Sequence, residues 1–196
     1  MFRVDADTHL DETEATWEHM TEAERRYKPL PLDPPEGKSV IEGDPRPHRL
    51  WCIDGRLKLR RTRDDARSGT VAGTRELSDV PLRLQHMDDM GVDIQVMYPT
   101  LLLAQVTDRP ESEVALCRSY NRWVAEATAK AGGRLRWVVV PPVLSMDHAL
   151  QELRFGKEHG ACGVLKRAVE CGGRADRKST RLNSSHIQKS RMPSSA

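Results

Sequence analysis

The 196-residue sequence predicts an α/β fold in which a parallel sheet is wrapped by helices. Apolar, strand-like runs alternate with segments of helical period, in the order β-α-β-α-β-α-β. No G-x-G-x-x-G follows a predicted strand and no complete G-x-x-x-x-G-K-[ST] occurs, so the nucleotide-binding open sheets lose their usual support. The sequence therefore favours a (β/α)8 TIM barrel. Because such barrels have about 250 residues, we expect this one to be truncated to about its first four βα units.

The first strand is expected at residues 2–6, FRVDA, and it runs into an acidic cluster. Residues 11–77 are charged and rich in proline, which is typical of an elaborated insertion rather than of regular barrel units. Within this insertion we predict one helix near Glu14 to Arg26. We also predict a small hairpin that turns at Asp54-Gly55.

Regular elements follow the insertion. Ser78 is predicted to cap a helix that carries Val80, Leu84 and Met87 on one face, and Gly91 is expected to end it in a left-handed conformation. The later elements are predicted as a strand at 92–99, a helix at 110–131 with Val114, Cys117, Tyr120, Val124 and Thr128 on one face, a strand at 135–140 buried on both faces, a helix from Ser145 to Gly160 with Leu150 and Leu153, and a strand at 162–166.

Charge is unevenly distributed along the chain. The net charge is +2, but residues 175–196 hold five Lys or Arg against one Asp, so the rest of the chain carries −2. This serine-rich tail has no hydrophobic period, and we expect it to be disordered. Its sequence also resembles adaptor-derived peptides at the ends of proteins translated from assembled sequencing reads. On this interpretation the tail is an artefact. The expected domain is thus residues 1–174.

Composition also limits localisation. The sequence has no signal-like N-terminus and no apolar run long enough to span a bilayer, so we expect a cytoplasmic protein that does not bind membranes. The four cysteines form no C-x-x-C pair, so neither a zinc knuckle nor a disulfide framework is indicated, and reduced thiols in or near the core are expected.

The strongest chemical signal is the run Asp5-Ala6-Asp7-Thr8-His9 at the carboxyl end of the first strand, where α/β barrels place their active-site groups. Alternate residues of a strand point the same way, so Asp5, Asp7 and His9 are predicted to converge. Carboxylate oxygen together with imidazole nitrogen suits zinc, manganese or iron.

This DADTH motif resembles the first-strand motif of the amidohydrolase-related family, which includes aminocarboxymuconate-semialdehyde decarboxylase and the γ-resorcylate type of decarboxylases. The resemblance extends to HMDDMGVDIQVMYPT, YNRWVAEATAKAGGRLRWVVVPP and HGACGVLK, and it covers about residues 1–10 and 77–170. It implies that Asp7 and His9 bind one divalent ion, with zinc as the preferred metal and manganese or iron as alternatives. It also implies that Asp5 orients the metal ligands without binding the ion itself.

The same resemblance implies a metal-dependent hydrolase or a non-oxidative decarboxylase that acts on a small carboxylated, amide or ester substrate. The family's later ligands and its acid or base would lie beyond residue 174, so no catalytic residue is assigned and the chain as given is expected to be inactive. A complete parent protein is expected to form homo-oligomers.

Further residues are candidates for the substrate pocket: Tyr98 and Thr100 after the second strand and Lys166 at the end of the fourth. Glu12 is close enough in sequence to reach the site, but we interpret it as a solvated loop carboxylate.

The alternative function is a non-catalytic α/β binding module whose basic tail contacts nucleic acid or an acidic partner. Because the tail has no interleaved aromatics and the chain lacks a helix-turn-helix or finger motif, no nucleic-acid partner is expected.

Overall fold

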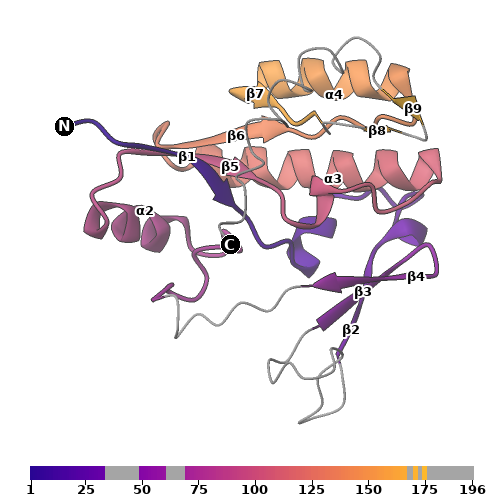
Figure 1. The fold of residues 1–196 in the computed structure, drawn as a ribbon, viewed down its shortest axis with the longest axis horizontal. Coiled ribbons are helices and arrows are strands. Elements are labelled where there is room, and N and C mark those ends of the chain that lie inside the picture. The colour runs from indigo at the N-terminus through magenta and orange to yellow at the C-terminus, as the bar shows by residue number, and fades with distance from the viewer. Residues whose placement is uncertain (34–48, 61–68, 167–169, 172–173, 176–196) are drawn as a thin grey trace, which may run out of the picture.

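The main sheet has four strands, all parallel, in the order β1-β5-β6-β7. The computed structural model describes residues 1–33, 49–60, 69–166, 170–171 and 174–175. Its regular elements are β1 (Val4–His9), α2 (Val80–Asp89), β5 (Ile94–Tyr98), α3 (Pro110–Ala129), β6 (Leu135–Val139), α4 (Met146–Glu158) and β7 (Gly163–Val164). The predicted alternation of strands and helices and the parallel sheet are therefore confirmed (Figure 1). The disorder predicted for the tail falls outside the described residues, apart from Ala175 in a short antiparallel pair, β8 (Glu170–Cys171) with β9 (Arg174–Ala175).

The N-terminal cap of helix α2 lies one residue later than predicted. The side chain of Asp79, not of Ser78, accepts a hydrogen bond from the backbone N–H of Leu82 at 2.8 Å, while the Ser78 hydroxyl donates to the carbonyl of Gly73. Both residue types cap helices well, so the sequence pattern alone does not choose between neighbours. Gly91 follows the helix with a φ of +65°, which confirms the predicted left-handed end.

Helix α3 is the central helix of the molecule, and its predicted face is confirmed. Val114, Cys117, Tyr120, Val124 and Thr128 are all buried. Strand β6 packs against this helix as a nearly continuous buried run, with only Arg136 exposed among its five residues. The helical period and the apolar run were correct guides here because both elements lie in the core.

Helix α4 begins after Ser145, as predicted, but only part of its expected face is correct. Leu153 is partly buried against the core, whereas Leu150 is exposed. The fully buried positions are Ala149, Glu152 and Gly156. A Cβ at Gly156 would lie 3.0 Å from the Cβ of Val139, so glycine allows the helix to approach β6 closely. Glu152 is buried because it pairs with Arg122 of α3 at 2.8 Å.

The insertion forms a second, small antiparallel sheet from β2 (Leu30–Leu32), β3 (Arg49–Ile53) and β4 (Arg56–Arg60). The predicted hairpin is confirmed, with Asp54 at φ +49° and Gly55 at φ +74° in its turn. The single helix predicted near Glu14 to Arg26 is wrong. Two short 3-10 helices, η1 (Glu14–Trp17) and η2 (Arg25–Tyr27), replace it.

The insertion joins the main core through aromatic packing. Trp17 of η1 and Trp51 of β3 are fully buried, and their rings meet edge to face at 6.2 Å. The second sheet lies beyond the carboxyl end of β1, close to the start of α3 (Figure 1). In the described part of the chain, no helix is long and apolar enough to cross a membrane.

Candidate functional site

Asp7 and His9 approach each other at the carboxyl end of β1. The distance from His9 Nε2 to Asp7 Oδ1 is 3.4 Å, and Asp7 is largely exposed. The other ring nitrogen, Nδ1, lies 2.9 Å from the carbonyl oxygen of Pro99. Because a carbonyl oxygen only accepts, Nδ1 carries the hydrogen. In the neutral ring, Nε2 then has its lone pair facing the Asp7 carboxylate.

Asp5 does not join this pair as strict strand alternation predicted. The register between β1 and β5 shifts between Asp5 and Thr8, so one extra residue of β1 is accommodated there. Asp5 and Thr8 consequently face each other, and the Thr8 hydroxyl donates to Asp5 at 2.6 Å. The Asp5 carboxylate also accepts from the backbone N–H of Asp7 at 3.2 Å, so it contacts the Asp7 backbone and not its side chain.

On its other side Asp5 enters a buried polar network. The Gln95 amide donates to Asp5 at 3.3 Å, and Arg83 of α2 donates to the Gln95 oxygen at 3.0 Å. Arg83 is 5% exposed, and this burial lowers its pKa to about 10, with the charge of Asp5 opposing the change. The network fixes the start of the bulge against α2.

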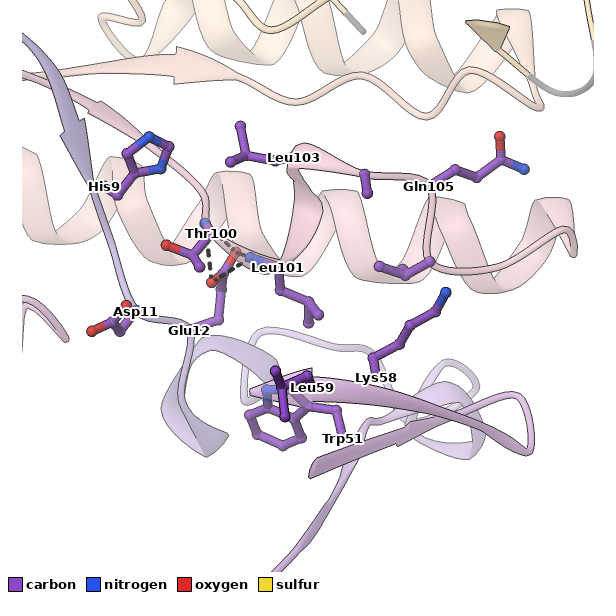
Figure 2. A pocket seen from close by; sticks show the side chains of 12 residues that line it. His9, Asp11, Glu12, Trp51, Lys58, Leu59, Thr100, Leu101, Leu103 and Gln105 are labelled. Carbon is purple, nitrogen blue, oxygen red and sulfur yellow. Dashed lines mark hydrogen bonds between the residues drawn. The ribbon is translucent and has the colours of Figure 1, made fainter. Parts of the chain in front are cut away.

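Glu12 is a strongly perturbed carboxylate of the site. It is 3% exposed, and it accepts hydrogen bonds at 3.0–3.3 Å from three consecutive backbone N–H groups, those of Thr100, Leu101 and Leu102 (Figure 2). Burial raises the pKa of Glu12 to about 7, and the backbone hydrogen bonds offset this only in part. The interpretation of Glu12 as a solvated loop carboxylate is therefore wrong.

A pocket of about 490 Å³ lies between the loop that follows β5 and the β3–β4 hairpin. Figure 2 shows Glu12 and His9 on one side of the pocket and Lys58, a residue of β4, on the other. Its lining is His9, Asp11, Glu12, Trp51, Lys58, Leu59, Thr100, Leu101, Leu103, Ala104, Gln105 and Val106. The pocket thus combines an apolar surface with a few polar groups, which is the usual composition of a small-molecule site.

The hairpin that forms one wall is fastened at its turn. Asp54 accepts a hydrogen bond from the Thr107 hydroxyl and lies 3.7 Å from the guanidinium of Arg109. Arg56, on the other side of the turn, pairs with Asp108 at 2.7 Å. These contacts hold the hairpin against the segment that precedes α3. The strand that carries Lys58 is therefore fixed in position.

The pocket candidates from the sequence are only partly brought together. Thr100 lines the pocket, and its buried hydroxyl has no hydrogen-bond partner within the described ranges. Tyr98 lies outside the lining but its ring is 6.2 Å from that of His9. Lys166 is exposed and does not line the pocket.

Sequence reasoning did not find Lys58, and it assigned Glu12 to solvent. Neither residue has a local signal, because the burial of Glu12 depends on the loop after β5 and the placement of Lys58 depends on the hairpin. Among the described residues, the candidate site included, no group of three or more His, Cys, Asp or Glu side chains is placed to hold a metal ion. Asp7 and His9 therefore supply two ligands at most.

No known family profile and no curated protein matches the sequence. Among solved structures, the chain is similar to an amidohydrolase from Mycobacterium avium subsp. paratuberculosis K-10, with a TM-score of 0.60 and 13% identity over 95% of this chain and 61% of that one. It is also similar to the apo form of IDCase from Metarhizium anisopliae, with a TM-score of 0.52 and 16% identity over 92% of this chain and 46% of that one. The chain thus shares the fold of part of these proteins, and it spans about three fifths of the first and under half of the second.

Proposed function

We propose that this chain is the N-terminal part, residues 1–174, of an amidohydrolase-like TIM-barrel enzyme in which Asp7 and His9 bind one divalent metal ion. The reaction would be hydrolysis of a small amide or ester, or non-oxidative decarboxylation of a small acid. The observation that carries the proposal is the arrangement of His9. Its Nδ1–H is held by a backbone carbonyl while Nε2 faces a carboxylate at the carboxyl end of the first strand.

The residues present fit part of a metal site. Metal-binding histidines usually donate their second ring N–H to a carbonyl or a carboxylate, which fixes the tautomer, and His9 does this with Pro99. One imidazole nitrogen and one carboxylate oxygen suit zinc, and also manganese or iron. Since two ligands do not complete a catalytic site, the proposal requires further ligands from the rest of the parent barrel.

Asp7 and His9 would hold part of the ion's coordination, and the ion would supply an acidified water for hydrolysis or a positive charge that polarises the substrate carboxylate for decarboxylation. The chain's own residues would orient the substrate. Thr100 offers a buried hydroxyl without a partner among the described residues, and Lys58 offers a cation on the opposite wall. A hydroxyl, an ammonium and apolar walls together favour a small acid whose carbon frame is apolar. This supports a carboxylated substrate.

Zinc titration of the metal-free chain tests the proposal, followed by the His9 ring nitrogens in NMR and by calorimetry. We expect weak binding that shifts the His9 Nε2 resonance and that is lost in Asp7→Asn and in His9→Gln. The chain offers a matched control, because His19 and Glu126 form another histidine–carboxylate pair at 3.9 Å. His19→Gln should leave zinc binding unchanged. A His9 resonance that does not respond to zinc, or a loss of binding in His19→Gln equal to that in His9→Gln, would contradict the proposal.

A further inference from the structure

The loops that follow β1 and β5 are joined through one short segment, residues 99–102. The backbone N–H of Leu10 donates to the carbonyl of Tyr98 at 2.8 Å, which continues the strand pairing by one residue. Beyond this point the two loops are connected by hydrogen bonds from side chains to the backbone. His9 donates to the carbonyl of Pro99, and Glu12 accepts from the three N–H groups that follow it. The segment is thus held by the last residue of β1 and by the loop that follows it.

We propose that Glu12 is a positioning residue for His9: by binding the N–H groups of residues 100–102 it fixes the Pro99 carbonyl, which selects the His9 tautomer that presents Nε2 to Asp7. The inference rests on the proposed function for its chemical meaning. Its geometric part can be tested independently of metal binding, because it concerns the metal-free protein. No contact between Glu12 and the His9 ring is required.

The Pro99 carbonyl and the Thr100 N–H belong to the same peptide group, which is planar. An anchor on the N–H side therefore also sets the direction in which the carbonyl oxygen points. Glu12 binds this N–H with both carboxylate oxygens, at 3.1 and 3.2 Å. Rotation of the peptide would break these bonds and move the Pro99 oxygen away from His9 Nδ1 at the same time.

A neutral imidazole has two tautomers of similar energy in water, and a hydrogen bond to one nitrogen decides between them. In this structure the Pro99 oxygen is the acceptor for Nδ1–H, and it lies 2.9 Å away. If that acceptor rotates away, the preference for the Nδ1–H form decreases. Nε2 then carries the hydrogen in part of the molecules and is no longer a ligand in them.

Glu12 also stabilises the first turn of η3 (Leu101–Leu103), so a purely structural role must be distinguished from a positioning role. A structural role predicts lower stability and faster amide exchange in residues 100–102 but an unchanged His9 ring. The ring nitrogen shifts of His9 are thus the informative signal, because ¹⁵N chemical shifts differ between the two tautomers.

The test compares the full chain with Glu12→Gln, without metal and at pH 8. Glutamine has the same length, but its NH₂ group faces backbone donors. We expect the ratio of Nδ1–H to Nε2–H tautomers to fall by about twofold to tenfold, the range for losing one hydrogen bond's net contribution. The matched control is Glu18→Gln, since Glu18 is an exposed residue of the same segment that pairs with Lys28. Its His9 tautomer ratio should equal that of the wild type.

Glu12→Asp provides a second variant if Glu12→Gln does not fold. It keeps the charge, but the shorter side chain does not reach all three N–H groups, so we expect a tautomer ratio between those of the wild type and Glu12→Gln. An unchanged ratio in a folded variant whose 100–102 amides exchange faster would overturn the inference. Because no metal is added, this result is distinguishable from a failure of zinc to bind.

Discussion

Replacing Glu12 by Gln should change how the stability of the fold depends on pH. The pKa of this buried carboxyl is raised from 4.5 to about 7 by burial, whereas in the unfolded chain it returns to its ordinary value. Between these two values the folded state keeps the proton that the unfolded state has released. Stability contributed by protonated Glu12 is therefore complete below pH 4.5 and is lost as the pH rises to about 7.

The size of the effect follows from the two pKa values. Their difference corresponds to roughly 3 kcal/mol in the free energy of unfolding. Tyr120 of α3 is a titratable group whose pKa responds to the charge of Glu12. Burial and that charge raise the pKa of Tyr120 well above 10, so it keeps its proton throughout this range. Glu12 is thus the group of this pair that titrates between pH 4.5 and 8.

Urea denaturation followed by tryptophan fluorescence is a suitable assay, because Trp17, Trp51 and Trp137 are fully buried. The free energy of unfolding of Glu12→Gln minus that of the wild type should increase by roughly 3 kcal/mol between pH 4.5 and pH 8. Taking the difference cancels the groups that the two proteins share. A difference that stays constant over this range would contradict the raised pKa of Glu12, because this group would then titrate alike in the folded and unfolded states.

Further predictions concern the pocket and the core. Lys58→Met should weaken the binding of benzoate to the metal-free chain by about tenfold or more in calorimetry, since a charge-assisted contact is lost, whereas the surface change Lys130→Met should not. Trp51→Ala should lower the free energy of unfolding by about 3–5 kcal/mol in urea denaturation. Gly156→Ala should cost about 1–3 kcal/mol in the same assay, because its new methyl group meets β6. Wild-type stability for either core variant would contradict the packing described.

Much of the regular fold was predictable because the signal was local. The period of α3 and the apolar run of β6 reflect burial directly, and Asp54-Gly55 has the chemistry that a tight hairpin turn needs. The bulge in β1 was not predictable, because it depends on the register with β5. The 3-10 helices of the insertion were missed for a related reason, since their shape follows from packing against α3 and not from helical propensity.

The candidate site divides in the same way. The pairing of Asp7 with His9 follows from their spacing on one strand, and the structure places them together. Glu12 required knowledge that another loop would bring three N–H groups to it. In this chain, sequence distance from the strand-end motif was a poor guide to the environment of a carboxylate.

The metal site itself can be located by diffraction from crystals of the chain soaked in zinc, recorded at the zinc absorption edge. We expect one anomalous peak at about 2.0–2.2 Å from both His9 Nε2 and an Asp7 carboxylate oxygen. A peak at another histidine, with none beside His9, would contradict the proposed metal site.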